Sequence, residues 1–583
     1  MKNQSITFSF VLGIILVLFS GCDFLDKQPT ERLTLDKVFA DDIETKRYLW
    51  NVYSYIPDES NVWAGTPWVG SADEADMTWE RAGYDTYLVN QGNYSPTTYY
   101  YQNWGYYYEG IRSASVFMNR VGENPELTET QITRFTAEAR FLRAYFYYLL
   151  LRQYGPVVIM EEVLPVDAPA EALQIPRSSF DECVNYIVQE LGTATQNLPL
   201  EIINDNWLGR ATKGAAMAVK STVLLYAASP LYNGNEDYAN FTNQDGTQLM
   251  NTTYDETKWK RAADAAKAVI DLNQYSLYTY GDGSDPYLNY KELFLDKWNE
   301  ETIWGRSNNG AWNLEIHSAP RSVNGWSGVA PTQAQVDAYF MANGKSIHAS
   351  GSGYVEEGFS TEDRKYTIAG TWMMYVNREP RFYASITYNG KVWPFSGERV
   401  ELFAEGSSGS KGSYDHSKTG YLLYKFTNPD SDIVQRNIPH KVWILFRLGE
   451  IYLNYAEALN EYNPGHPDIA KYVNLIRNRS GLPDLPANLS QDEMRQAIHH
   501  ERRVELAFEG HRYFDTRRWK IAPETDAGPF YGMNISAGDS FDDEAFYQRT
   551  AYETRSFESK NYLWPLPQNA VNRNKELVQN PGW

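Results

Sequence analysis

The sequence predicts a mainly α-helical protein built from tetratricopeptide-like helix pairs, with a loop-rich region and short strands in its middle. Three observations favour this fold class. Apolar residues recur at three- and four-residue steps in several segments, these segments end at Gly or Pro, and alanines stand where paired helices would touch. The spacing of the pairs is too irregular for a uniform repeat array.

The first half of the chain contains four helical patterns. In residues 132–153 the apolar positions mark one buried face, and Gly155-Pro156 ends the run. Similar stripes cover three more segments, 178–198, 213–228 and 259–272. We therefore expect an N-terminal helical part over about residues 36–275.

Helical patterns return after residue 445. Stripes over 448–462 and 469–476 precede Ser490-Gln-Asp-Glu493, a capping box that predicts a helix reaching Phe508. Residues 276–445 read as a loop-rich binding part with short strands, one of them over 381–388 before Asn389-Gly390. We expect a single large domain over 36–583, with its C-terminal helical part over about 446–583.

The N-terminus has the layout of a secretory signal peptide over residues 1–21. Lys2 is followed by an apolar stretch, and Leu18-Phe19-Ser20-Gly21 leads directly to Cys22. A Cys after Ser-Gly matches the bacterial lipobox, although Phe19 replaces the usual aliphatic residue. We expect cleavage before Cys22, acylation of its thiol, and a lipid-anchored tether over residues 22–35.

Composition narrows the class of ligand. The net charge of −21 opposes binding to nucleic acid, whose backbone is also negative. Aromatic residues make up 15% of the chain, including 17 Trp and 44 Tyr, and such amphipathic rings suit a ligand with apolar faces and polar edges. Sugars have this character.

Catalytic and metal-binding patterns are weak. Asp73, Glu74 and Asp76 form an acidic cluster, but any acidic chain offers such clusters, and a glycosidase needs two carboxylates across the scissile bond. His499-His-Glu501 lacks the spacing of a zinc protease. We therefore expect no catalytic residue, no metal site and no cofactor.

Several segments in a fixed order carry a resemblance to a known family. They are Cys22–Asp26, Ala137–Tyr145, Tyr154–Pro156, Lys213–Ala216, Pro331–Gln333, Arg378–Phe382, Arg447–Tyr452, Glu501–Gly510 and Trp564–Gln568. In this order they resemble the SusD/RagB family of outer-membrane nutrient-binding lipoproteins, over nearly the whole chain. The resemblance implies a SusD-like fold.

The resemblance also implies a role. Such proteins face the cell exterior on the outer membrane, above a SusC-like TonB-dependent transporter. They capture an oligosaccharide, or another nutrient, without chemical change. Two alternatives stay open for this chain: a surface glycoside hydrolase, and a binder of peptides or another non-sugar nutrient.

Two aromatic regions are the candidate binding site. The expected ligand-binding residues are Trp63, Trp68, Trp79 and Asp73 from the early loops, and Trp312, Arg321, Asn324 and Trp326 from the loop after Trp304. Trp104 and Trp304 lie within helix and strand patterns and are expected in the core. The charge-dense segment 501–518 is expected to form a structural ion-pair network.

Overall fold

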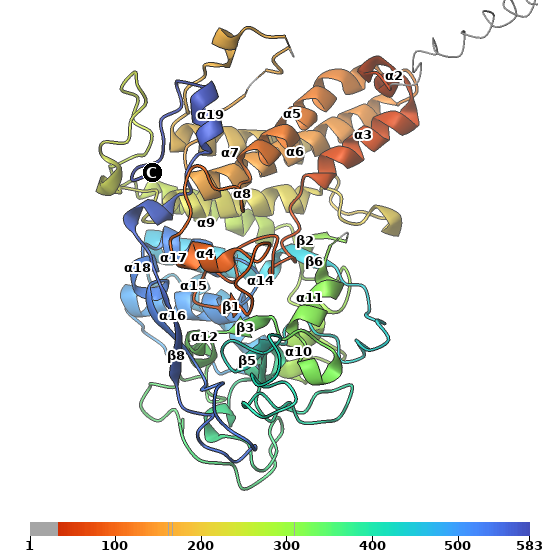
Figure 1. Cartoon of the computed structure of the whole chain (residues 1–583). Helices are drawn as coiled ribbons and strands as arrows, with labels where there is room; N and C mark the ends of the chain where they lie inside the picture. The colour runs from red at the N-terminus through yellow and green to blue at the C-terminus, as the bar shows by residue number, and fades with distance from the viewer. Residues whose placement is uncertain (1–32, 161, 166, 308) are drawn as a thin grey trace, which may run out of the picture.

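The computed structural model describes residues 33–583 except 161, 166 and 308. The predicted signal peptide, Cys22 and most of the predicted tether lie outside these residues. The described chain begins with helix α2 (Leu35–Ala40), whose first turn is capped by the Thr34 side chain. Helices stack in one part of the molecule and loops with short strands fill the other (Figure 1).

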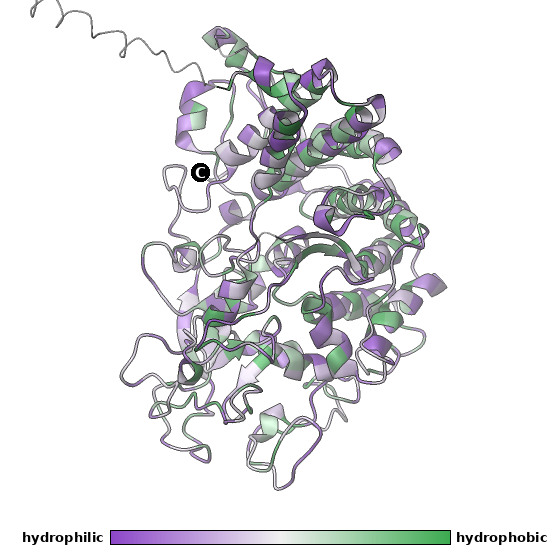
Figure 2. Ribbon diagram, turned by 90° about the vertical axis from the view of Figure 1, so that its right-hand side faces the viewer, coloured by the Kyte–Doolittle hydropathy of each residue, from purple (hydrophilic) through white to green (hydrophobic). Residues whose placement is uncertain are grey.

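The helices of the N-terminal half pack in sequence order. They are α3 (Asp42–Ser54), α5 (Trp104–Arg120), α6 (Glu129–Tyr154), α7 (Phe180–Asn197), α8 (Lys213–Ala228) and α9 (Thr257–Ile270). From α5 onward each helix packs against the next, which confirms the expected helix pairs. Helices with apolar and polar positions side by side can be seen in Figure 2, as expected where one face of a helix is buried.

The C-terminal helices extend this stack. They are α14 (Leu448–Tyr462), α15 (Pro467–Arg479) and α16 (Gln491–Glu505), followed by α17 (Arg512–Arg518). Helix α14 packs on α9 from the first half and on α15 and α16. The capping box at Ser490 forms as predicted, with Glu493 accepting from the Ser490 backbone N–H. The mainly α-helical prediction is confirmed.

Helix α6 is the centre of the N-terminal stack. Its residues 141–151 are all buried, so it is covered on every side rather than on one stripe. It ends at Gly155, whose φ of 72° is unfavourable for other residues. A Cβ there would also lie 2.9 Å from Leu563, so the C-terminal segment can pack closely on the helix end.

Short antiparallel strand pairs join distant segments. In the described chain they form four two-stranded sheets: β1 (Ala75–Met77) with β3 (Val329–Pro331), β2 (Thr302–Arg306) with β6 (Trp443–Arg447), β4 (Ile386–Tyr388) with β5 (Tyr421–Leu423), and β7 (Gly528–Gly532) with β8 (Thr550–Arg555). The first pair brings the early loops beside the segment after α11 (Ala311–Ser318), with Asp76 opposite Ala330. This pairing positions the candidate site.

The strand predicted over 381–388 is wrong in its first part. Residues Pro380–Ser385 form helix α13, and only Ile386–Tyr388 form a strand. Pro380 occupies the first turn of α13, where its fixed φ favours a helix. The helix also directs the buried Arg381 side chain to Glu379 and Glu501.

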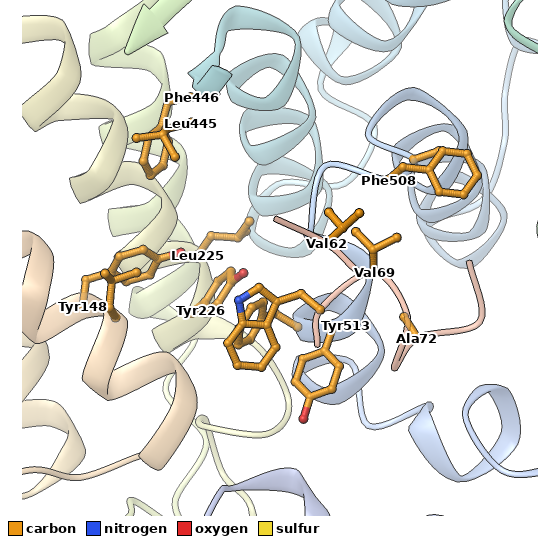
Figure 3. Close-up of a cluster of buried hydrophobic side chains, with 14 of the residues drawn as sticks. Val62, Val69, Ala72, Tyr148, Leu225, Tyr226, Leu445, Phe446, Phe508 and Tyr513 are labelled. Atoms are coloured by element: carbon orange, nitrogen blue, oxygen red, sulfur yellow. The ribbon is translucent and has the colours of Figure 1, made fainter. Parts of the chain in front are cut away.

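The hydrophobic core draws on the whole chain. Figure 3 shows buried side chains from the early loops, α6, α8, β6 and the C-terminal segment: Val62, Val69, Ala72, Tyr148, Leu225, Tyr226, Leu445, Phe446, Phe508 and Tyr513. Trp104 and Trp304 are also buried, as predicted. The Trp304 ring packs edge-on against Phe141 and Tyr145 of α6.

A buried ion network crosses this core. Arg447 donates hydrogen bonds to Glu301 (2.8 Å), Glu505 (2.7 Å) and Glu509 (2.8 Å), and all four side chains are almost fully buried. Burial alone would raise the pKa of Glu509, but Arg447 and Lys425 outweigh it and hold the pKa at about 2. Glu509 is therefore charged inside the protein.

Two further arginines complete the network. Arg381 donates to Glu501 (2.6 Å) and Glu505 (2.9 Å). Arg479 binds Glu301 (2.9 Å) and also Glu505. Glu505 is shared by three arginines and Glu301 by two, while Glu509 pairs with Arg447 and Lys425. The charges of α13, α15, α16 and β6 therefore compensate one another.

The charge-dense segment around α17 is structural, as predicted. Arg502 and Arg518 both bind Asp515, each at 2.8 Å. Arg512 binds Asp73 at 2.7 Å and so ties the C-terminal helices to the early loops.

Replacing Arg447 by Met would leave Glu301, Glu505 and Glu509 buried without their shared cation. We expect the free energy of unfolding to fall by about 3–5 kcal/mol, because removing one partner leaves uncompensated buried charges. Urea unfolding followed by tryptophan fluorescence measures this loss.

Lys260→Met is the matched control. Lys260 pairs with Asp264 on the exposed surface of α9, so its loss should leave the unfolding midpoint unchanged. Equal midpoints for Arg447→Met and Lys260→Met would contradict the stabilising role of the buried network.

Candidate ligand-binding site

The two tryptophans after β2 are exposed. Trp312, in the first turn of α11, has 49% of its surface accessible, and Trp326, which follows the short 3-10 helix η6 (Arg321–Val323), has 42%. Among the tryptophans of the predicted site, these two present indole surface to solvent.

The loop between α11 and β3 holds Trp326 in place. The backbone N–H of Trp326 donates to Ile316 at 2.8 Å, and that of Ser327 donates to Ala319 at 3.0 Å. The loop therefore folds back along the end of α11. Gly325 makes this possible, because a Cβ there would lie 2.2 Å from the Ala319 carbonyl oxygen.

His317 is the centre of an aromatic cluster beneath Trp326. Its ring stacks on Trp63 with centroids 4.5 Å apart, and meets Trp79 and Trp326 edge-on at 5.6 and 4.7 Å. Nδ1 lies 2.9 Å from the Asn313 carbonyl oxygen. Burial lowers the pKa of His317 to about 4, so the ring is neutral near pH 7.

The two predicted aromatic regions therefore meet, but their tryptophans differ in exposure. Trp63 and Trp79 are each 7% exposed and support Trp326 from below. The Trp79 indole N–H donates to Asp415 at 3.0 Å. Trp68 lies apart from this cluster and packs between Tyr513, Phe514 and Trp564.

Asp73 is committed to an ion pair. Both of its oxygens accept from Arg512, at 2.7 and 2.9 Å, and Arg503 lies 2.9 Å away. Burial would raise the pKa of Asp73, but the two arginines hold it at about 2. Asp73 also borders a cavity of about 530 Å³, shared with Thr332 and Arg503.

In its neighbour Glu74 the pKa is raised instead of lowered. It is fully buried and accepts from the Phe508 N–H at 3.0 Å. Burial raises the pKa of Glu74 to about 8, so this carboxyl is protonated near pH 7. The acidic cluster therefore faces the protein interior.

Arg321 and Asn324 occupy the rim. Arg321 donates from Nε to the Ser407 carbonyl at 3.0 Å and from Nη1 to the Asp415 carbonyl at 3.2 Å. Asn324 is exposed and has a left-handed backbone conformation, with φ of 62°. Arg321 thus holds the 405–418 loop beside Trp326.

The sequence reading missed two contributors to this surface. Arg81 lies over the rings of Trp79 and Tyr84, at 5.9 and 5.2 Å from their centroids. Tyr414 is 90% exposed and adjoins Asp415, which contacts both Trp79 and Arg321. In the sequence, the position of Tyr414 in a Gly/Ser-rich loop is the signal that could have indicated its role.

Within residues 33–583, outside the three gaps, no helix combines the length and apolar character needed to cross a bilayer. In the same part of the chain, no three His, Cys, Asp or Glu side chains are placed together to hold a metal ion.

Comparison with known proteins identifies the family. A family model described as "SusD family" matches residues 298–583, and one described as "Starch-binding associating with outer membrane" matches residues 23–225. The chain is 23% identical to a SusD-like protein of Bacteroides ovatus, covering 98% of this chain and 97% of the relative. It is also 23% identical to the starch-binding protein SusD of Bacteroides thetaiotaomicron, covering 78% and 74%.

Among solved structures, that of BT4246 superposes with a TM-score of 0.82 at 28% identity, covering 93% of this chain and 99% of the other. Its fold is the mainly helical arrangement described above. The chain belongs to the SusD/RagB family, a family of starch- and glycan-binding proteins associated with the outer membrane.

Proposed function

We propose that this protein captures oligosaccharides at the cell surface and delivers them to a SusC-like TonB-dependent transporter. The observation that carries the proposal is the exposed pair Trp312 and Trp326, with Trp326 supported by the buried cluster around His317. The starch-binding relative and the family model named for starch binding support a glycan as the ligand.

The geometry suits a sugar. The C–H face of a pyranose ring stacks on an exposed indole, while its hydroxyls require hydrogen-bonding groups at the edge. Asn324 offers an exposed amide two residues from Trp326. Arg321 lies at the same rim, with two of its nitrogens already bonded to carbonyls, which fixes its position. We assign ligand contact to these four residues.

The remaining predicted residues have other roles in this proposal. Trp63 and Trp79 support the platform from within. Trp68 and Asp73 contribute through packing and through the ion pair with Arg512.

A non-catalytic role is favoured over a glycoside hydrolase. Hydrolysis needs two accessible carboxylates about 5–10 Å apart across the bond. Asp73 is bound by two arginines and Glu74 is fully buried, so neither is available to a glycosidic oxygen. Incubation with glycans and assay of reducing ends separates the two functions, because steady release of smaller sugars would refute the binding role.

Membrane attachment follows from the N-terminal sequence. We propose that Cys22 is acylated after cleavage of residues 1–21 and that the protein faces the cell exterior. Two or three acyl chains give lasting attachment, since each buried methylene contributes about 0.8 kcal/mol.

Trp312→Ala and Trp326→Ala should each weaken glycan binding at least tenfold, about 1.4 kcal/mol, because each removes a stacking surface. A glycan array identifies the ligand, and isothermal titration calorimetry measures its affinity. The melting temperature should change little, since both rings are half exposed.

Phe395→Ala is the matched control, because Phe395 is an exposed aromatic residue on another loop and should not affect binding. Unchanged affinity in a stable Trp312→Ala/Trp326→Ala double variant would place the site elsewhere. An array with no glycan signal but with peptide binding would favour the peptide-binding alternative.

Cys22→Ala should leave the protein unlipidated and released from membranes, while the body still folds. Fractionation in detergent-free extracts from cells lacking the transporter measures this. Retention of the variant in the outer-membrane fraction at the parental level would refute lipid attachment through Cys22.

A large β-barrel protein should co-purify with this chain after gentle detergent extraction of membranes. Mass spectrometry of the purified material identifies it. Repeated recovery of this chain alone would count against a stable complex with a transporter.

A further inference from the structure

A second aromatic cleft lies between the helical stack and strand β2. It has a volume of about 520 Å³, within the range of roughly 300–1,000 Å³ typical of small-molecule sites. Its wall is formed by α3, by the loop that precedes α8 and by the end of β2, including Trp50, Trp207, Arg210 and Arg306. Figure 1 shows α3, the β2–β6 pair and α11 in this order down one side of the molecule.

Two exposed tryptophans flank one arginine in this cleft. Trp50 is 38% exposed and Trp207 is 44% exposed. The guanidinium carbon of Arg210 lies 4.9 Å from the Trp50 ring centroid and 4.8 Å from that of Trp207. Arg210 therefore lies between the two indole rings, and each ring is still partly exposed to solvent.

The cleft is held rigidly. The Trp304 indole donates to the Gly209 carbonyl at 2.9 Å, and the Ala211 N–H donates to the Tyr53 hydroxyl at 2.9 Å. These bonds fix the segment that carries Trp207 against β2 and α3. A ligand would therefore meet preformed ring surfaces and lose little binding energy to ordering them.

The two arginines of the cleft are each held by a carboxylate. Arg210 donates from Nε to Glu138 at 2.9 Å and from Nη2 to the other oxygen of the same carboxylate. Arg306 lies 3.5 Å from Asp58, as an ion pair. Glu138 also accepts from Arg134 at 3.1 Å, so one carboxylate holds two arginine side chains and keeps Arg210 in place.

Hydrogen-bond donors nevertheless remain. Arg306 lines the cleft with 20% of its side chain exposed, and its Nη1, the atom that faces Asp58, makes no hydrogen bond within the described chain. The exposed amide of Asn206 stands beside Trp207. Aromatic ring faces with hydrogen-bond donors between them match the chemistry of a sugar.

We propose that this cleft is a second carbohydrate-binding site, in which Trp50 and Trp207 stack on sugar rings and Arg306 donates to a hydroxyl oxygen. Arg306 in the cleft and Trp312 in the first platform are six positions apart in the sequence, so the two sites adjoin along the chain. An oligosaccharide engaging both would gain affinity through effective concentration. The assignment of a carbohydrate as the ligand of this cleft rests on the proposed function. The presence of a binding site in the cleft does not depend on that function.

Fluorine NMR of protein labelled with 5-fluorotryptophan tests both sites separately. Single Trp→Phe variants assign the resonances of Trp50, Trp207, Trp312 and Trp326. The probes are maltoheptaose, laminarihexaose, and xylan, mannan and galactan oligosaccharides, each to roughly 10 mM, which detects millimolar affinities.

The Trp50 and Trp207 resonances should shift with at least one probe. The shift at Trp50 should persist in the Trp312→Ala/Trp326→Ala variant and be lost in Trp207→Ala. Arg306→Met should weaken this binding at least threefold without changing the melting temperature. Tyr254→Ala, an exposed aromatic residue on another face of the helical stack, is the control and should have no effect.

The outcomes distinguish the two proposals. If the resonances of Trp312 and Trp326 shift while those of Trp50 and Trp207 do not, the second site is refuted and the proposed function stands. Shifts confined to Trp50 and Trp207 would support the second site and refute the first platform. If no probe shifts either pair, both proposals fail. If Trp50→Ala/Trp207→Ala instead abolishes recovery of the barrel partner while no sugar shifts the cleft resonances, the cleft is a protein interface.

Discussion

The buried cluster of Arg447 with Glu301, Glu505 and Glu509 is the constraint on which the rest of the fold depends. Removing four charges from water is costly, and only close hydrogen-bonded geometry compensates that cost. The residues come from segments more than 140 positions apart, as the 146-residue separation of Glu301 and Arg447 shows. These segments must therefore converge together, and the cluster fixes how β6 meets α16.

The geometry of the candidate site depends on this arrangement. The pairing of β1 with β3 places the early loops beside the end of α11, and the Arg512–Asp73 ion pair fastens the same loops to the C-terminal helices. His317 then fills the space between Trp63, Trp79 and Trp326. The exposed indole of Trp326 thus stands on a rigid base, although it belongs to a loop.

Local patterns predicted the helices well because apolar spacing and caps are local signals. Helix α8 begins and ends where its alanine-rich stripe indicates, and Ser490 caps α16. The sequence failed where long-range contacts decide. Residues 381–388 were predicted as a strand before the Asn389-Gly390 turn, yet Pro380 and the ion pairs of Arg381 with buried glutamates favour a helix over Pro380–Ser385.

Exposure of aromatic residues was the least predictable property of the site. Trp68 and Trp326 have similar polar and glycine neighbours, but only the fold shows that Trp68 packs under Tyr513 while Trp326 faces solvent. The contribution of Tyr414 depends on its loop meeting Trp79 across more than 300 residues, which periodicity cannot indicate. The cleft between Trp50 and Trp207 could not be predicted either, because its walls come from segments that are far apart in the sequence.

The position of the C-terminal segment has a consequence for biosynthesis. Asn580 donates to the carbonyls of Tyr154 and Trp564, and Arg555 donates to the Ala72 carbonyl, so the last thirty or so residues bind the earliest helices and loops. A ribosome-bound chain lacks these contacts until synthesis ends. The early helices and loops therefore complete their packing only after the C-terminal segment has been synthesised.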